Sequence, residues 1–173
     1  MKFTGAAIHR CPLPAHALSA RYASDGYADC YVTRVPQAVA HAQFVEAFYT
    51  TWLFKLERAI LRWLVRMPST DLEARELAHG NRNVFAAWKV EARAPDQLLM
   101  CDFRGATRSW LMVESASADA GGGTHLYFGS VVVPVRTSNG KKAMSFGFRA
   151  LLGFHKLYSR ALLRAARARL TRA

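Results

Sequence analysis

His155 and Tyr158 lie three residues apart, and their side chains are of types that can orient a ligand or move a proton. Both fall on the apolar side of a helix predicted from about Ser145 to Leu170. We expect the imidazole and the phenol to project into a cavity and to contact a bound molecule there. The alternative is a core histidine whose ring bonds to a backbone carbonyl or to Asp102.

Asp102 is the acidic residue that the strand pattern places on the inward face of the predicted sheet. A carboxylate in that position must be paired, solvated or protonated, because burial of an isolated charge costs too much free energy. One interpretation is a structural salt bridge with Arg104 or Arg108 near the strand end. The other is an acid at the wet mouth of a pocket.

The sequence lacks the motifs of the common metal, nucleotide and hydrolase sites. His41, His79 and His125 share no spacing typical of a metal site. Ser130 follows Gly129 inside a strand pattern and has no GxSxG around it. The triple glycine 121–123 precedes a strand and lacks the Lys-Ser/Thr of a phosphate loop. We therefore predict no catalytic residue, no metal and no cofactor.

The elements that position these residues follow from periodicity and turn chemistry. One strand precedes two helices and a short third helix; four strands and a long final helix follow. Pro36 can occupy the first turn of the first helix, and Gly80 provides the stop of the third. The predicted ranges are Tyr27–Thr33, Pro36–Tyr49, Thr51–Arg66, Ser69–His79, Val84–Arg93, Gln97–Phe103, Thr107–Ser117, Thr124–Val135 and Ser145–Leu170.

Short turns between the later strands predict an antiparallel register. Trp88 then lies opposite Asp102, and Met100 lies opposite both Val90 and Ser109. The inward face carries an apolar group that ends at the polar side chains of Asp102, Thr107 and Ser109. Its apolar members are Trp88, Val90, Met100, Leu111 and Val113, with Ala86 and Ala92 on the same face of their strand.

The final helix combines an apolar side with a row of cations. At about 100° per residue, the apolar side holds Phe148, Leu151, Leu152, His155, Tyr158, Leu162, Leu163 and Ala166. The cations are Arg149, Lys156, Arg160, Arg164 and Arg167. Residues 120–173 contain ten basic and no acidic residues, a net charge of +10 out of +12 for the chain. The row indicates either a solvated helix face or a contact with a polyanion.

Four tryptophans in 173 residues are a high density. Stacking on nucleic-acid bases requires exposed aromatic rings among basic residues. Trp52, Trp63 and Trp88 fall on apolar faces of their predicted elements instead. The pattern therefore favours core or cavity-lining positions for these three rings.

Length and composition predict one domain, residues 27–173, preceded by an N-terminal arm of residues 1–26 that packs only in part. The 51% hydrophobic content is sufficient for a core without disulfides. Cys11, Cys30 and Cys101 are odd in number and share no CxxC spacing, which suits a reducing cytoplasm. The first residues are not typical of a secretory signal, and the charged Thr51–Arg66 helix is not typical of a membrane span. We predict a cytoplasmic protein.

The order of elements from Tyr27 to Leu170 resembles the helix-grip fold of the START-like superfamily. That superfamily includes lipid-transfer domains, birch-pollen allergens and polyketide cyclases. Within it, the segments RSWL at 108–111 and LYFGS at 126–130 look like a bacterial family of unknown function. Two features depart from the usual layout. Four strands are predicted between the helix pair and the final helix, where such proteins usually have six, and the short helix is extra. The resemblance implies a curved antiparallel sheet gripping the long helix around an apolar cavity, and it implies no catalytic residue.

These observations lead to three functional hypotheses. The first is a protein that binds a small apolar or amphipathic ligand between the sheet and the final helix. Its predicted ligand-binding residues are Trp88, Met100, Asp102, Leu111, Phe148, Leu152, His155 and Tyr158. The second is a cyclase- or aromatase-like enzyme that uses His155 with Tyr158 or Asp102 as acid–base groups. The third is a basic module that binds nucleic acid or an anionic membrane.

Overall fold

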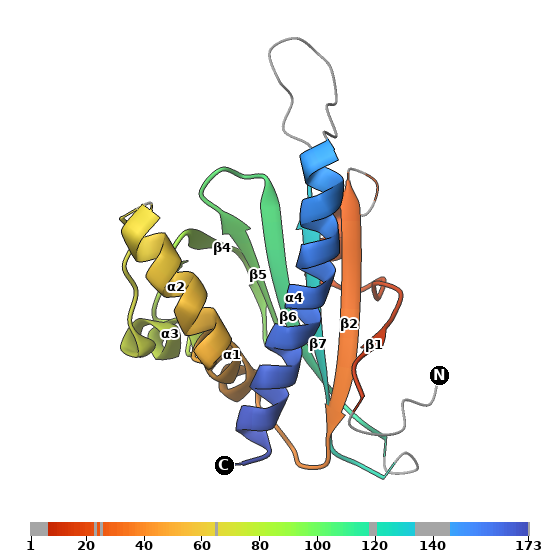
Figure 1. Cartoon of the computed structure of the whole chain (residues 1–173). Coiled ribbons are helices and arrows are strands. Elements are labelled where there is room, and N and C mark those ends of the chain that lie inside the picture. Colours follow the sequence, from red (N-terminus) through yellow and green to blue (C-terminus); the bar gives the residue numbers. More distant parts are fainter. Residues whose placement is uncertain are drawn as a thin grey trace.

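The computed structural model describes residues 7–22, 24, 26–64, 66–117, 121–133 and 146–172, and the side chains of α4 from residue 156 onward (Figure 1). The chain forms one sheet with helices on its inner side. The elements in order are β1 (His9–Arg10), the 3-10 helix η1 (Leu18–Tyr22), β2 (Tyr27–Val35), α1 (His41–Tyr49), α2 (Trp52–Leu64), α3 (Asp71–Ala78), β3 (Val84–Phe85), β4 (Trp88–Ala94), β5 (Gln97–Asp102), β6 (Thr107–Ser115), β7 (Thr124–Val132) and α4 (Phe146–Leu170).

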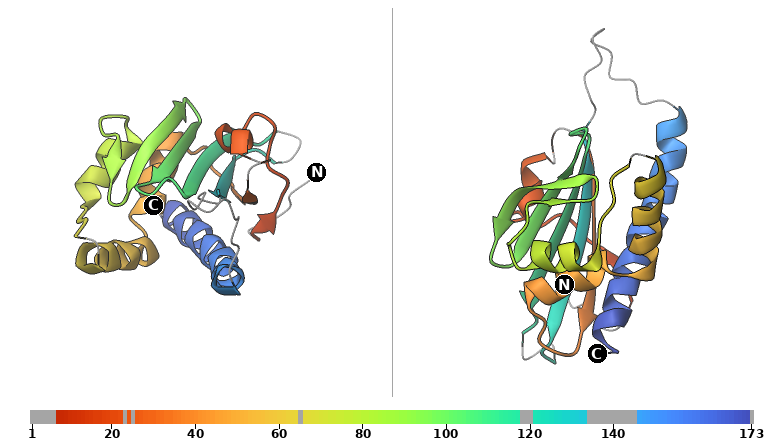
Figure 2. Two further views of the ribbon diagram at one scale, coloured as in Figure 1. Left: turned by 90° about the horizontal axis from the view of Figure 1, so that it is seen from above. Right: turned by 90° about the vertical axis from the view of Figure 1, so that its left-hand side faces the viewer.

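The described strands form a curved, antiparallel, seven-stranded sheet in the order β1-β2-β7-β6-β5-β4-β3. The 25-residue helix α4 packs across β2 and β7, and α1 and α3 cover the other end of the same face. Figure 2 shows α2 and α4 as an outer layer on one side of the sheet. This mixed α+β architecture is the predicted fold class and is consistent with the helix-grip arrangement.

The predicted register of the inner face is confirmed at its central pairs. Trp88 pairs with Asp102, and Met100 pairs with Val90 on one side and Ser109 on the other. A β-bulge between Val90 and Ala92 was not predicted. Because the bulge adds one residue, Ala92 moves to the outer face of the sheet, where it packs against Leu99 and its neighbours.

The strand predicted over Val84–Arg93 is in fact a tight hairpin of β3 and β4. Phe85 pairs with Trp88, and the turn lies at Ala86 and Ala87. Ala86 has a φ of 51°, a conformation usually taken by glycine or asparagine. The prediction missed the turn because two alanines carry no turn signal.

The N-terminal segment covers the outer face of the sheet. Side chains from Cys11 to Tyr22 pack on a buried group centred on Trp110, whose indole donates to the Gln97 side chain at 2.8 Å. The same amide oxygen accepts the Leu18 backbone N–H at 2.9 Å. Cys11 and Cys30, which share no sequence motif, lie with their sulfur atoms 3.2 Å apart. This face is closed by side chains.

The helices agree with the prediction in number and order but differ at their ends. α1 begins at His41, five residues after Pro36, and the Gln43 side chain accepts the Ala40 backbone N–H at its start. α3 is capped by Thr70, which exchanges hydrogen bonds with Glu73, and Gly80 follows it with a φ of 82°. The extra short helix predicted at Ser69–His79 is therefore present.

Candidate functional site

A cavity of about 620 Å³ lies between α2, α4 and the inner face of the sheet. Its volume is within the range of small-molecule sites. Most of its wall is aromatic and aliphatic, and a few polar groups interrupt it. The described lining residues are Phe48, Tyr49, Leu53, Phe54, Leu56, Glu57, Ile60, Leu61, Ala87, Trp88, Asp102, Phe103, Thr107, Arg108, Ser109, Phe128, Ser130, Leu157, Tyr158, Ser159, Ala161 and Leu162.

The cavity exists because α2 does not continue the packing of α1. α1 ends at Tyr49, and the hydroxyl of Thr51 then accepts the Phe54 backbone N–H at 3.1 Å, which starts a new helix in another direction. α2 lies alongside α4 instead of on the sheet (Figure 1). The rings of Phe48, Tyr49 and Phe54 pack edge to face or tilted against one another at the floor.

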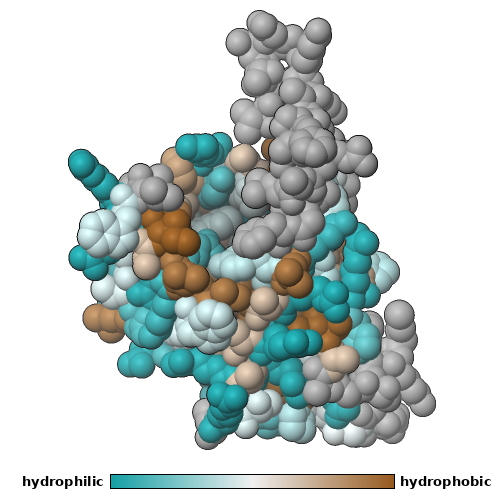
Figure 3. Space-filling model, viewed as in Figure 1, coloured by the Kyte–Doolittle hydropathy of each residue, from teal (hydrophilic) through white to brown (hydrophobic). Residues whose placement is uncertain are grey.

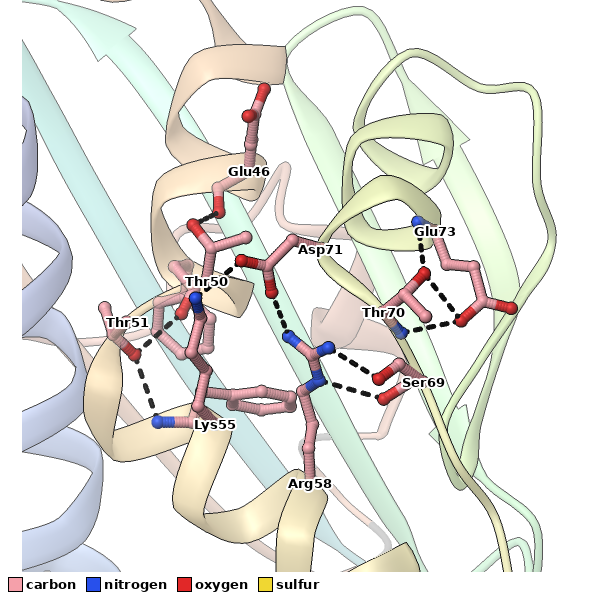
Figure 4. A network of polar contacts seen from close by, with 11 residues as sticks. Glu46, Thr50, Thr51, Lys55, Arg58, Ser69, Thr70, Asp71 and Glu73 are labelled. Carbon is pink, nitrogen blue, oxygen red and sulfur yellow. Dashed lines mark hydrogen bonds and ion pairs between the residues drawn. The ribbon is translucent and has the colours of Figure 1, made fainter.

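A polar network fixes α2 to the start of α3 (Figure 4). The guanidinium of Arg58 donates to Asp71 at 2.6 Å and to the side chain and carbonyl of Ser69 at 3.0 and 2.6 Å. Lys55 donates to the other oxygen of Asp71 at 2.5 Å. Burial alone would raise the pKa of Asp71, but the hydrogen bonds and charges of Lys55 and Arg58 outweigh it and lower that pKa.

A second polar cluster lies inside the cavity. The Tyr158 hydroxyl of α4 donates a short hydrogen bond to the Glu57 carboxylate of α2, and the Trp88 side chain also donates to it. Burial raises the pKa of Glu57, and these two hydrogen bonds offset only part of the rise. Burial, then the charge of Glu57, raises the pKa of Tyr158 well above its usual range. The cluster offers a carboxyl group that can accept or release a proton beside an apolar space.

Four residues on the cavity wall carry buried hydroxyls: Tyr49, Ser109, Ser130 and Ser159. The Tyr49 hydroxyl is wholly buried near Ser109, and burial raises the pKa of Tyr49. Within the described residues, neither the Tyr49 nor the Ser159 hydroxyl has a hydrogen-bond partner of good geometry. Ser130 donates to Asp29 at 2.6 Å. The Tyr49 and Ser159 hydroxyls could therefore hydrogen-bond to a polar group of a bound molecule.

The residues predicted from the sequence divide into three groups. Trp88, Asp102 and Tyr158 line the cavity. Met100 and Leu111 belong to the fully buried core of the inner face and do not line it. The side chains of Phe148, Leu152 and His155 lie outside the described residues.

Asp102 has a structural role at the cavity edge. Its carboxylate accepts the backbone N–H groups of Ala106 and Thr107 at 2.8 and 3.2 Å and so holds the turn between β5 and β6. The salt bridge suggested for it with Arg104 or Arg108 does not form. Arg108 pairs with Glu91 at 3.2 Å instead, and its guanidinium carbon lies 4.5 Å from the centre of the Tyr22 ring.

Glu57 is the functional candidate that sequence reasoning missed. A signal for it exists, because Glu57 is the one acidic residue in Thr51–Arg66. At about 100° per residue it falls among the leucines of α2 and far from the side of Lys55, Arg58 and Arg62. A carboxylate on the apolar side of a strongly amphipathic helix is a candidate for a buried polar contact.

The prediction that Trp52 and Trp63 take core or cavity-lining positions is wrong. Their side chains are 73% and 82% exposed on the outer face of α2. Leu56 and Ile60, 53% and 50% exposed, lie between this face and the cavity, and Leu157 of α4 lies at the opposite rim. Figure 3 shows apolar side chains over α2 beside a hollow. The mouth of the cavity is thus bordered by exposed apolar groups.

The cationic row of α4 is only partly solvated. Arg160 and Arg164 are exposed. Lys156 lies 5.5 Å from the centre of the Tyr27 ring, and Arg167 donates to the Arg34 carbonyl at 3.1 Å. The Arg149 side chain lies outside the described residues. Two of the five predicted cations therefore have contacts within the protein.

The described part of the chain has neither a cluster of metal-binding side chains nor a helix suited to a membrane. No group of three or more histidine, cysteine or acidic side chains there could hold a metal ion. No helix there has the length and apolar character that a membrane crossing requires.

Comparison with known proteins gives similarity at the level of structure alone. No protein-family model matches the chain, and no curated protein does. The chain is similar to the crystal structure of CalU16 from Micromonospora echinospora, with 14% sequence identity and a TM-score of 0.30. The match covers 94% of this chain and 90% of that chain. At this identity and TM-score, nothing about the ligand or the activity of this protein follows from it.

Proposed function

We propose that the protein binds one small, mainly apolar molecule with a polar group in the cavity between α2, α4 and the sheet. The observation that carries this proposal is the Glu57–Tyr158–Trp88 cluster on the mainly apolar wall of an approximately 620 Å³ cavity. Apolar walls supply affinity, and a few fixed polar groups orient the ligand. With its raised pKa, a protonated Glu57 can donate to a carbonyl or ether oxygen, and its carboxylate can accept from a hydroxyl.

The neutral dye N-phenyl-1-naphthylamine tests cavity binding directly. We expect enhanced fluorescence and saturation at one dye per chain. Ala161→Trp places an indole in the cavity and should weaken binding by at least about ten-fold, because the dye and the ring compete for the same space. Ala168→Trp on the same helix is the matched control, because Ala168 does not line the cavity. Equal binding by the wild type and Ala161→Trp would reject the proposal.

An acid–base enzyme is the second candidate, and the environment of Glu57 favours it. A carboxyl group with a raised pKa, held by a phenol and an indole, is suited to proton transfer. Native mass spectrometry of the purified wild type and Glu57→Gln separates the two functions. An enzyme retains different molecules in the two proteins, because the variant accumulates the unconverted compound. A binding protein retains the same molecule, with lower occupancy in the variant.

A further inference from the structure

The outer face of α2 is an apolar surface in a chain that is otherwise strongly basic. At about 100° per residue, Trp52, Trp63, Leu56 and Ile60 fall within about 80° of one another. Each of these four side chains is at least half exposed. The two indoles are about 16 Å apart along the helix axis. Isolated exposed apolar residues are common, but four on one helix face form a patch that indicates a partner.

Cations border this patch. Lys55 and Arg62 lie within about 80° of Trp52 on the side away from the cavity. Arg62 and Arg66 are exposed, and no described carboxylate lies within ion-pair distance of either. The only acidic residue of α2, Glu57, faces the cavity. Lys55 pairs with Asp71 of α3, so the positive charge beside the indoles that no described carboxylate neutralises comes from Arg62 and Arg66.

A basic groove lies on the other side of the cavity mouth. It has a volume of about 510 Å³ and is formed by β1, β2 and α4. Its described lining residues are Ile8, His9, Arg10, Tyr31, Lys156, Leu157 and Arg160, and none of them is acidic. Leu157, 68% exposed, lines both this groove and the large cavity. The exposed side of the α2–α4 layer thus carries the indoles of α2, then the mouth of the cavity, and then a basic groove that is suited to an anionic group.

We propose that this side of the molecule, the outward faces of α2 and α4, docks on an anionic lipid surface. Indole rings prefer the boundary between acyl chains and headgroups, and neighbouring cations contact lipid phosphates. A second copy of the chain is a poorer partner, because it would bring two surfaces of a +12 protein together. The mouth of the cavity faces the docked surface. Docking does not require a filled cavity, so it is independent of the proposed ligand binding.

Vesicle sedimentation tests the docking. Vesicles of phosphatidylcholine mixed with phosphatidylglycerol should retain the protein at low salt, and vesicles of phosphatidylcholine alone should retain much less. Added NaCl should weaken binding, because salt screens the attraction to the anionic lipid. Tryptophan emission should shift to the blue, and brominated acyl chains should quench it. A wild-type protein that stays unbound at low salt overturns the proposal.

Two pairs of variants locate the surface. The double substitution Trp52→Gln with Trp63→Gln should weaken vesicle binding by at least about ten-fold, since it removes the inserting rings. Leu72→Gln with Val84→Gln is its control, because these side chains are also exposed but lie on α3 and β3. Arg160→Gln should weaken binding by about five-fold, the loss expected for one cation near the lipid surface. Lys89→Gln, an exposed cation of β4, is the control for it.

Other outcomes would assign the surface to another partner. Equal loss in the tryptophan variant and in its control would place the contact elsewhere. A wild-type dimer that the tryptophan variant converts to a monomer would identify a self-association face and overturn the proposal. Tighter binding to duplex DNA than to anionic vesicles, unaffected by the tryptophan variant, would do the same. The tryptophan variant should bind N-phenyl-1-naphthylamine as the wild type does, which separates failure of docking from failure of ligand binding.

Discussion

α1 and α2 follow one another in the chain, are both amphipathic, and have opposite surroundings. The large apolar side chains of α1, including Phe44, Phe48 and Tyr49, are at most 1% exposed because α1 packs on the sheet, on α3 and on α4. The apolar side chains of α2 instead border a cavity or face outward. Apolar periodicity alone therefore does not determine whether a helix face is buried in the core.

The difference lies in what holds each helix. α1 is held by aromatic packing, including Phe48 against Phe128 at 4.8 Å between ring centres. α2 is held on one side by the Arg58 contacts with the start of α3 (Figure 4). On the other side it is held by the Glu57 contact with Tyr158 of α4. Polar contacts at its two sides keep α2 in place without a filled space beneath it. We infer that α1 serves stability and that α2 serves the cavity and its mouth.

The largest expected effect is the difference in unfolding free energy between a variant of α1 and a variant of α2. Phe44→Ala in α1 should lower the free energy of unfolding by about 3–5 kcal/mol, because it leaves a hole in a close-packed core. Trp52→Ala in α2 removes a larger but exposed ring and should change it by less than about 0.5 kcal/mol. Urea denaturation followed by far-UV circular dichroism measures both. Similar losses in the two variants would contradict the division between the helices.

A smaller effect is expected within α2 itself. Arg58 and Lys55 both pair with Asp71, but the Arg58 side chain is 10% exposed and that of Lys55 is 47% exposed. Arg58→Gln should cost about 1.5–3 kcal/mol of stability, the range for hydrogen bonds to charged groups, because Ser69 and Asp71 lose their partner. Lys55→Gln, the matched control, should cost at most about 1 kcal/mol, as exposed ion pairs do. Equal costs would show that burial does not strengthen the Arg58 contacts.

Local chemistry was sufficient to predict much of the fold. Period-two alternation around Trp88 and the short turns between the later strands gave the inner register, and Gly80 gave the stop of α3. The sequence did not reveal the bulge near Glu91 or the Ala86–Ala87 turn. Both depend on tertiary packing and not on residue type, since Ala86 adopts a positive φ that its own chemistry disfavours.

The candidate site was predicted only in part, for a related reason. Tyr158 and Trp88 were identified because each lies on the apolar face of its helix or strand, and the apolar face of the helix must pack toward that of the sheet. Met100 and Leu111 lie on the correct face, but α1 and its neighbours cover them. Glu57 was missed because the sequence does not show that the apolar side of α2 borders a cavity. A wheel diagram gives the direction of a side chain around a helix and does not give the distance of that helix from the sheet.

The smallest expected effect is a pH dependence with opposite signs on the two sides of α2. Folding raises the pKa of the Glu57 carboxyl above its ordinary value of 4.5. Between pH 4.5 and that raised pKa, the folded protein therefore binds more protons than the unfolded protein. The contribution of Glu57 to stability is therefore fully present below 4.5 and is lost as pH rises through the raised pKa. The difference in unfolding free energy between wild type and Glu57→Gln isolates this change, because the other carboxyl groups contribute equally to both proteins.

Asp71, which pairs with Lys55 and Arg58 of α2, should give a pH dependence of stability with the opposite sign. Its pKa is lowered in the folded state, so its contribution is present above its ordinary value of 3.8 and is lost as pH falls through the lowered pKa. Relative to Asp71→Asn, the wild type should gain stability with rising pH; relative to Glu57→Gln, it should lose stability with rising pH. Urea denaturation at a series of pH values measures both differences. Parallel curves for wild type and Glu57→Gln would mean that the Glu57 carboxyl is solvated, and the cavity would then lack the proton-carrying group on which the enzymatic alternative depends.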